Sequence, residues 1–259
     1  VEHVGEPCAH RKGRNRHRLL EGYRRRHCLR AGKARRQSHD HLHFRLEPGP
    51  RRRSRCTHRV PQQRLAAASM RADLRLPESP AVIVDATLKA FSTNAIDVLV
   101  NNAGVEQNRL LTDVSAEDFN RVFDVNVRGA MLMTRAVIPH LRAPGRIVNI
   151  SSLGARRGFS GYTVYCASKA ALEGFTRALA VELGAAGHSV NAVAPGPTES
   201  DMLYTLSEEI LETQKKRTPM QNRIGTKDDI AQVVAWLASE SSRWVTGQTI
   251  SATGGIETL

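Results

Sequence analysis

Residues 146–184 read RIVNISSLGARRGFSGYTVYCASKAALEGFTRALAVELG and contain the first sign of an α/β fold. Residues 146–150 are predicted to form a buried strand. Residues 163–184 have a helical pattern that ends at Gly184 and Gly187, since glycine commonly terminates helices. A strand followed by a loop and a long helix is the repeating unit of proteins with a parallel sheet.

The same alternation continues on both sides of this stretch. Two more buried strands are predicted, at 96–100 (IDVLV) and 189–194 (SVNAVA), and three more helices, at 81–93, 115–140 and 226–239. Ser115 and Asp118 have the spacing of a capping box, and Thr226 is a suitable N-cap. The pattern predicts an α/β fold with a doubly wound parallel sheet, covered by helices on both faces. Ligands of such sheets bind at the carboxyl ends of the strands.

Charge divides the 259 residues into two parts. The net charge of the chain is +13, but residues 1–64 hold 19 of the 38 basic and 5 of the 25 acidic residues, a net of +14. Residues 65–259 are almost neutral and have an ordinary globular composition. We therefore predict an anomalous basic segment at 1–64 and one folded domain at 65–259.

The basic segment has too few apolar residues to form a helix face or an alternating strand, which favours disorder. Its aromatic residues are only Tyr23 and Phe44, so base stacking has little support and nucleic-acid binding is unlikely. His39, His41, His43 and Cys56 match no closed zinc spacing, and we predict no metal site.

The sequence predicts neither a membrane-spanning segment nor a secretory signal peptide. It has no run of 18 apolar residues, and its opening residues are charged and lack the apolar core of a signal peptide. The four cysteines have no regular spacing, which argues against a disulfide scaffold. We expect a cytoplasmic protein.

Three polar side chains follow the strand at 146–150. Tyr165 and Lys169 are four residues apart and share one helix face. A lysine ammonium beside a phenol lowers the phenol pKa, which prepares the phenol for proton transfer. Ser152, at the ligand-binding end of the strand, can donate a hydrogen bond to a substrate oxygen. Tyr162 has no such partner, because position 166 is Cys, and we interpret Cys166 as a structural thiol.

Six motifs follow one another along the chain in the order and spacing of a known family. They are NNAG at 101–104, VNVRG at 125–129, IVNISS at 147–152, YCASK at 165–169, VNAVAPG at 190–196 and TGQTISATGG at 246–255. Together they resemble the short-chain dehydrogenase/reductase family over about residues 70–259. The resemblance implies a Rossmann-like fold and hydride transfer between NAD(P)(H) and a carbonyl/alcohol pair, as in a ketoreductase.

Specific roles follow from the resemblance. Tyr165 would act as general acid or base, and Ser152 would polarise the substrate oxygen. Lys169 would lower the pKa of Tyr165 and bind the nicotinamide ribose, while Asn126 would position a water that links Lys169 to solvent. The implied cofactor-binding residues are Asp73, Leu74, Asn102, Ala103, Gly104, Tyr165, Lys169, Pro195, Gly196 and Thr198.

The resemblance also implies a partner and a mobile segment. NADP or NAD is the implied cofactor, with NADP slightly favoured, and the substrate is a small carbonyl or alcohol compound. A homodimer or homotetramer is expected, through the helices at about 116–140 and 163–184. Residues 200–222 are expected to form a lid over the substrate, or a helix that packs on the core.

The first βαβ unit of the family is missing from residues 1–64. The family pattern Thr-Gly-x-x-x-Gly-x-Gly, which cradles the pyrophosphate, does not occur there. Shifting the reading of residues 8–18 by one base permits Val-Leu-Thr-Gly-Lys-Gly-Gly-Ile-Gly-Ile-Gly, one residue short of the family spacing. Residues 1–64 are therefore either a disordered segment or a frameshifted first unit. The alternative functions are a non-catalytic relative unable to hold the cofactor and, with less support, nucleic-acid binding.

Overall fold

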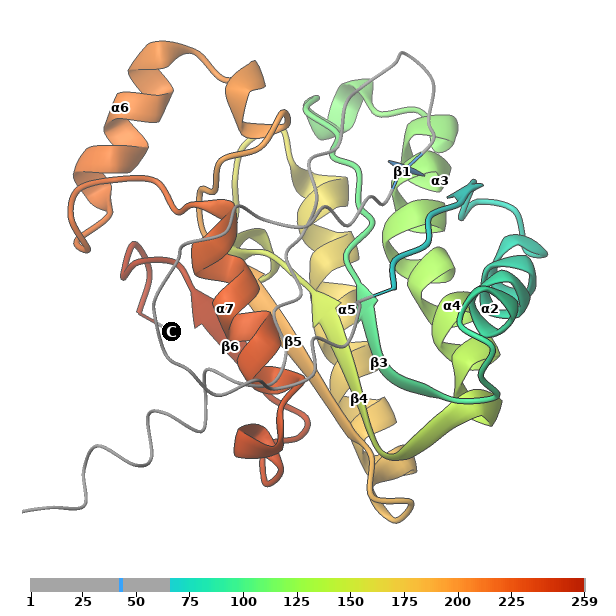
Figure 1. Ribbon diagram of the computed structural model, residues 1–259. Coiled ribbons are helices and arrows are strands. Elements are labelled where there is room, and N and C mark those ends of the chain that lie inside the picture. The colour runs from blue at the N-terminus through green and yellow to red at the C-terminus, as the bar shows by residue number, and fades with distance from the viewer. Residues whose placement is uncertain (1–41, 44–65, 259) are drawn as a thin grey trace, which may run out of the picture.

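The computed structural model describes residues 42–43 and 66–258 (Figure 1). In this part of the chain four parallel strands form one sheet in the order β3-β4-β5-β6. The strands are β3 Ile96–Asn101, β4 Leu141–Ile150, β5 Ser189–Pro195 and β6 Thr249–Ala252. Their carboxyl ends lie along the same edge, since Asn101 pairs with Asn149 and Pro195 pairs with Ala252.

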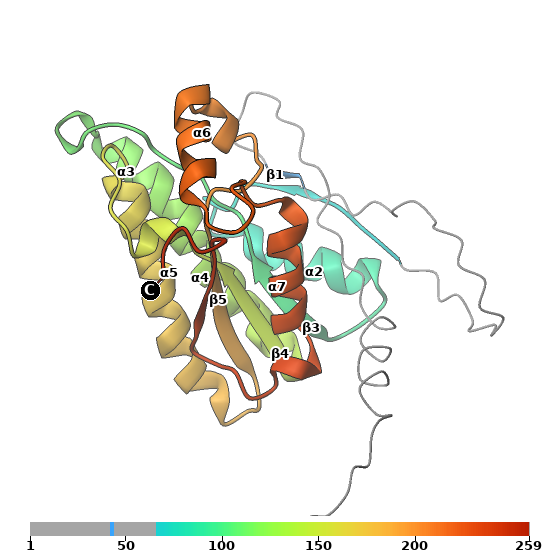
Figure 2. The same ribbon diagram turned by 90° about the vertical axis from the view of Figure 1, so that its left-hand side faces the viewer.

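Helices cover both faces of this sheet. They are α2 Ser79–Ala90, α3 Ala116–Phe123, α4 Ala130–Val137, α5 Thr163–Gly184, α6 Glu208–Arg217 and α7 Lys227–Leu237. Helix α7 lies on one side of the sheet, and α4 and α5 lie on the other (Figures 1 and 2). The predicted Rossmann-like parallel sheet, with helices on both faces, is confirmed for the described residues.

Neighbouring residues of β4 face opposite layers of the core. Ile147 packs against Leu179 of α5, whereas Val148 packs against Val193 and Leu237 of α7. All of these side chains are buried. Because fully burying an aliphatic side chain is worth roughly 1.5–3 kcal/mol, the alternation fixes which side of the strand meets which helix. This alternation also fixes the register of the site residues at the strand ends.

Most helix ends are determined by residues close to them in the sequence. One predicted helix, however, is interrupted in the structure. Both predicted caps form, because Ser115 and Thr226 each accept a hydrogen bond from the third residue of their helix in a complete capping box. The predicted helix at 115–140 is divided by a π-helical turn at Asp124–Gly129. The helix predicted at 81–93 begins two residues earlier, with Pro80 in its first turn, where proline's missing N–H costs nothing.

Two further segments complete the description. Strand β1 (Leu42–His43) pairs antiparallel with β2 (Arg71–Ala72). Apart from Leu42–His43, the predictions for residues 1–64 lie outside the described residues. Within the described ranges, no helix combines the length and apolar composition that crossing a membrane requires.

Candidate active site

Tyr165 and Ser152 meet at the carboxyl end of β4. Tyr165 lies in the first turn of α5, and Ser152 lies two residues beyond the last residue of β4. The Ser152 hydroxyl lies close enough to the Tyr165 phenol to lower its pKa through hydrogen bonding. Ser152 Oγ also accepts the backbone N–H of Gly154 at 3.0 Å, so its hydroxyl hydrogen can point toward Tyr165.

The pKa of Tyr165 differs in direction from the sequence-based expectation. Burial is the largest influence and raises this pKa, and the hydrogen bond with Ser152 opposes it. The negative charge of Glu106 and the neighbouring Cys166 and Tyr162 raise it further. Burial therefore outweighs the lowering of the pKa expected from Lys169, whose Nζ lies 5.8 Å from the ring centroid of Tyr165.

Lys169 is buried one helical turn after Tyr165. Its Nζ donates a hydrogen bond of 2.8 Å to the backbone carbonyl of Ile150, the last residue of β4. Burial lowers the pKa of Lys169 to about 8, because an ammonium is poorly solvated in the protein interior. The contact places the amine at the edge of the sheet where ligands of this fold bind.

Asn126 lies in the π-helical turn and connects two segments of the site. Its Nδ2 donates to Val105 O at 2.9 Å and to Ser168 Oγ at 3.0 Å, and its Oδ1 accepts from Val105 N at 2.8 Å. Asn126 is fully buried. The widened turn thereby ties the loop after β3 to helix α5, and π-turns of this kind are frequent at functional sites.

Two glycines show how closely the site is packed. A Cβ atom at Gly104 would lie 3.2 Å from Lys169 Nζ and 3.4 Å from Asn126 Oδ1. A Cβ atom at Gly154 would lie 3.4 Å from both Ser152 Oγ and Tyr165 Cε1. The structure therefore brings together the four side chains that the sequence predicts as catalytic: Asn126, Ser152, Tyr165 and Lys169.

The other cofactor-binding residues predicted from the sequence are distributed around this group. Ala103 and the exposed Asn102 connect β3 to Gly104. Asp73 lies apart, in a bidentate ion pair with Arg75 that lowers the pKa of the Asp73 carboxyl. Leu74 packs against the π-helical turn, because a Cβ at Gly129 would lie 3.1 Å from Leu74 Cβ.

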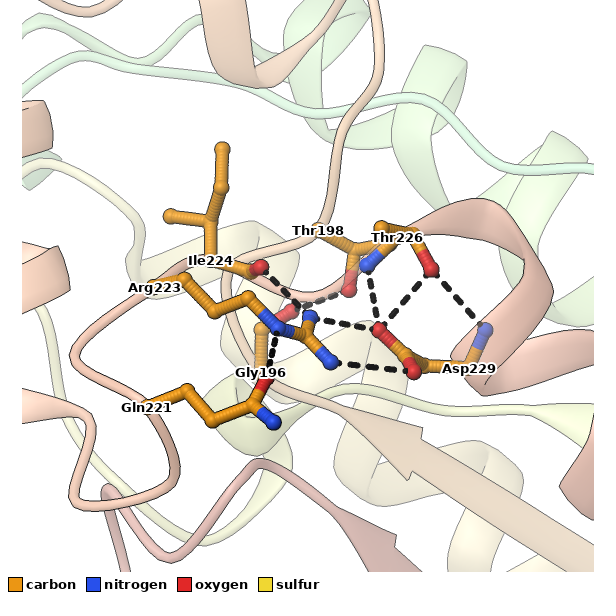
Figure 3. Close-up of polar contacts among 7 residues, drawn as sticks. All are labelled: Gly196, Thr198, Gln221, Arg223, Ile224, Thr226 and Asp229. Atoms are coloured by element: carbon orange, nitrogen blue, oxygen red, sulfur yellow. Dashed lines mark hydrogen bonds and ion pairs between the residues drawn. The ribbon is translucent and has the colours of Figure 1, made fainter.

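The remaining predicted residues follow β5. Pro195 ends this strand, and Gly196 donates its N–H to Ala252 O at 3.1 Å. A side chain at Gly196 would collide with Thr253, so only glycine permits this close approach. Thr198 Oγ1 donates to Gly196 O at 2.9 Å (Figure 3). Thr198 also forms a parallel bridge with Gly225.

The chain returns to this point after the predicted lid at 200–222. Figure 3 shows the guanidinium of Arg223 against the carboxylate of Asp229, in the first turn of α7. The contacts are 2.6 and 3.2 Å, and Arg223 also donates to Ile224 O at 3.0 Å. Sequence reasoning did not single out this pair, although Asp229 is the capping-box residue that begins α7. The segment between Thr198 and Gly225 includes α6, which lies beyond the carboxyl ends of the strands (Figures 1 and 2).

Cys166 lies beside the site, and its Sγ would be 3.3 Å from a Cβ atom at Gly154. Its Sγ is 3.8 Å from the carbonyl of Arg157, and burial raises the pKa of its thiol. A raised thiol pKa reduces the thiolate fraction at neutral pH, which agrees with the structural role expected from the sequence.

The comparisons with known proteins agree with this fold. The sequence matches the family described as Enoyl-(Acyl carrier protein) reductase over residues 50–257. It is 49% identical over 195 residues to Dehydrogenase OXI1 of Cochliobolus heterostrophus, covering 73% of this chain and 84% of that protein. It is 44% identical over 189 residues to Short-chain dehydrogenase/reductase FrzI of a Cladobotryum species, covering 70% and 72%.

Solved structures give the same result. A short-chain dehydrogenase/reductase from Brucella melitensis, titled Glucose/ribitol dehydrogenase, superposes with a TM-score of 0.69 at 33% identity and covers 73% of this chain and 75% of its own. One from Serratia marcescens gives 0.68 at 32% identity, with coverages of 72% and 75%. The chain belongs to the short-chain dehydrogenase/reductase family, a family of oxidoreductases.

Proposed function

We propose that the chain transfers a hydride reversibly between NAD(P)(H) and a small carbonyl or alcohol substrate. The observation that carries this proposal is the contact of Tyr165 with Ser152, one helical turn before the buried amine of Lys169. A phenol hydroxyl and a serine hydroxyl that meet at the carboxyl end of a parallel strand can bind one substrate oxygen between them. When bound, the nicotinamide supplies or accepts the hydride.

The chain's own residues would handle the proton and orient the substrate. Tyr165 Oη would donate a proton to the carbonyl oxygen during reduction and accept one from the hydroxyl group during oxidation. Ser152 Oγ accepts from the backbone and would donate its hydroxyl hydrogen to the same oxygen. Asn126 would hold Gly104 and α5 at a fixed separation, because its amide bonds to both segments. The predicted water beside Asn126 stays a prediction.

The residues around Lys169 fit the ribose end of a nicotinamide dinucleotide. Among the described residues, the Lys169 ammonium hydrogen-bonds to Ile150 O, so two of its N–H donors can serve ribose hydroxyls. Thr198, Gly196 and Gly104 border the same strand ends, where a dinucleotide lies in this fold. The family's pyrophosphate-binding glycine turn belongs to the unit missing from residues 1–64, so we propose no contact for the pyrophosphate. The choice between NADP and NAD, the homo-oligomer and the cytoplasmic location stay predictions.

Tyr165→Phe tests the catalytic role directly. We expect this variant to lose turnover of ketones and alcohols by at least about 10³-fold, because the phenylalanine ring has no proton to transfer. Its affinity for NADPH and NADH, measured by fluorescence titration, should stay close to that of the unchanged chain. Equal turnover in both proteins would overturn the assignment.

The rival interpretation is a non-catalytic family member that cannot hold the cofactor. The same titration, made on the full chain and accompanied by circular dichroism, separates the two. Saturable binding supports the oxidoreductase, and absence of binding in a folded chain supports the rival. The interpretation as a nucleic-acid-binding protein depends on residues 1–64, almost all of which lie outside the described residues.

A further inference from the structure

Glu173 is a buried carboxylate that the proposed chemistry does not use. It lies on α5, one helical turn after Lys169 and two turns after Tyr165. Its side chain is only 7% exposed. A charged side chain is rarely buried to this degree unless partners satisfy its oxygens.

Its two carboxylate oxygens bind different residues. Oε1 accepts the hydroxyl of Ser151 at 3.1 Å, and Oε2 accepts Nε of Arg156 at 3.0 Å. Ser151 immediately precedes Ser152, and Arg156 immediately follows the short 3-10 turn Leu153–Ala155. One carboxylate therefore holds both ends of the segment that carries Ser152.

This arrangement couples the two halves of the candidate active site. The segment 151–156 brings Ser152, and α5 brings Tyr165 and Lys169. The single hydroxyl hydrogen of Ser151 is shared with Lys169 O, 3.3 Å from its Oγ, and the Ser151 N–H donates to Val193 O at 2.8 Å. Holding the two ends of a short turn restricts where the hydroxyl between them can point.

Stabilisation of the fold alone is a weaker explanation for Glu173. A buried ion pair adds little net stability, because desolvating two charges offsets their attraction, and apolar residues of similar size often replace such a pair without loss. An apolar pair, however, would not bind Ser151 and Arg156 at defined positions. Directional contacts on both sides of Ser152 indicate a geometric function.

We propose that Glu173 is a positioning residue that holds Ser152 in hydrogen-bonding reach of Tyr165 and of the substrate oxygen. The inference rests on the proposed oxidoreductase function. It extends the site from four side chains to a second layer formed by Glu173, Ser151 and Arg156.

Two variants of the full chain separate positioning from folding. Glu173→Gln keeps the size of the side chain but removes the charge that binds Arg156. The double variant Glu173→Leu with Arg156→Leu replaces the buried carboxylate and its partly exposed partner by apolar side chains, which protects the fold if the single change destabilises it. Glu182→Gln, at an exposed position of the same helix, is the matched control.

The first readout needs neither cofactor nor substrate. Fluorotyrosine is incorporated and titrated by ¹⁹F NMR, with Tyr165→Phe identifying the Tyr165 signal. Besides Ser152, the groups that face this phenol are Glu106, Cys166, Tyr162 and Lys169, and none of them is changed. Loss of the Ser152 hydrogen bond should raise the Tyr165 pKa by about half to one unit in both variants and leave it unchanged in Glu182→Gln.

The second readout is steady-state turnover of a ketone that the unchanged chain reduces with NADPH. We expect kcat to fall roughly 10- to 100-fold in both variants, with a smaller change in KM, because a misplaced hydroxyl weakens the transition state most. A folded double variant with unchanged kcat and an unchanged Tyr165 titration would overturn the proposal. If the unchanged chain turns over no substrate, the proposed function fails, but the NMR titration still decides the role of Glu173.

Discussion

Two segments border the candidate active site, and they are held in different ways. Residues 151–184 are anchored by buried polar groups, since Ser168, Lys169 and Glu173 are all almost inaccessible to solvent. The segment between Thr198 and Gly225 is fixed at its ends, where Gly225 N donates to Pro197 O at 2.8 Å and Glu199 N donates to Gly225 O at 2.9 Å. Between these ends, several large apolar side chains are exposed, namely Tyr204, Ile210 and Met220.

Under the proposed function, the difference separates the part expected to perform chemistry from the segment predicted to act as a lid over the substrate. A proton-transfer group must be held within a fraction of an ångström, and buried hydrogen bonds achieve this because breaking them leaves unsatisfied polar atoms. A lid needs only fixed ends, and a segment with few buried contacts opens at low free-energy cost. We therefore expect changes in the first segment to affect kcat and changes at the ends of the second to affect KM.

The largest expected effect in the anchored segment comes from Lys169→Met. Burial lowers the pKa of Lys169 to about 8, whereas the unfolded chain has the ordinary lysine value of 10.5. Below pH 8 the charged amine therefore destabilises the folded state, by about 3 kcal/mol, and this destabilisation disappears as pH rises from 8 to 10.5. The variant should be more stable than the unchanged chain at pH 7, and this advantage should vanish near pH 10.5.

Urea unfolding across this pH range measures the effect. Lys89→Met, at an exposed position of α2, is the control and should show no such pH-dependent difference. A stability difference between Lys169→Met and the unchanged chain that does not vary with pH would contradict the assigned burial. Turnover by Lys169→Met should be lost, since the site then lacks its buried amine.

A smaller effect is expected from Gly154→Ala. The new methyl group would lie 3.3 Å from Cys166 Sγ, which must shift slightly, and would pack directly against Ser152 Oγ and Tyr165 Cε1 at 3.4 Å. We expect kcat to fall about tenfold and stability to fall by about 1 kcal/mol. Gly158→Ala is the matched control, because its methyl group would have no neighbour within 4 Å. Equal kcat values in the two variants would show that the contact of Ser152 with Tyr165 is not sensitive to position.

The smallest effect should come from Thr226→Ala at the base of the lid. Loss of the cap of α7 costs about 1 kcal/mol, and it loosens the contact of Asp229 with Arg223. KM should rise about threefold while kcat is retained, because the substrate-admitting segment changes and the anchored one does not. Ser115→Ala removes the equivalent capping box of α3 and should give the same stability loss with unchanged KM. A kcat loss in Thr226→Ala as large as that in Gly154→Ala would remove the distinction between the two segments.

Much of the fold could be predicted from local patterns. The apolar runs at 96–100 and 189–194 indicate buried strands because each lies between helical patterns, and the structure places β3 and β5 there. Strand β5 is buried as predicted, but the burial predicted for 96–100 is wrong, because β3 lies at the edge of the described sheet and is only partly covered. The caps at Ser115 and Thr226 are local hydrogen bonds, so their sequence spacing is sufficient. The π-helical turn around Asn126 was not predictable in this way, because contacts with Val105 and Ser168, distant in sequence, accompany it.

The candidate site also has features that local sequence patterns predict and features that depend on distant contacts. The spacing of Tyr165 and Lys169 on one helix, and the position of Ser152 after a strand, were readable because helix periodicity and strand polarity are local properties. The direction in which the pKa of Tyr165 shifts could not be predicted from the sequence, since it depends on how deeply the assembled core buries the phenol. The contacts of Glu173 could not be predicted either, because the sequence shows it only as a charged residue in an apolar stretch.

The sequence by itself therefore determined the order of strands and helices, the edge of the sheet where ligands bind and the four side chains expected to act there. Only the tertiary structure decided how those side chains are held. It placed Glu173 between Ser151 and Arg156, bonded Arg223 to Asp229, and buried Lys169 deeply enough to lower its pKa. The physical reason is that hydrogen-bond partners and desolvation come from segments that are distant in sequence and meet only when the chain is folded.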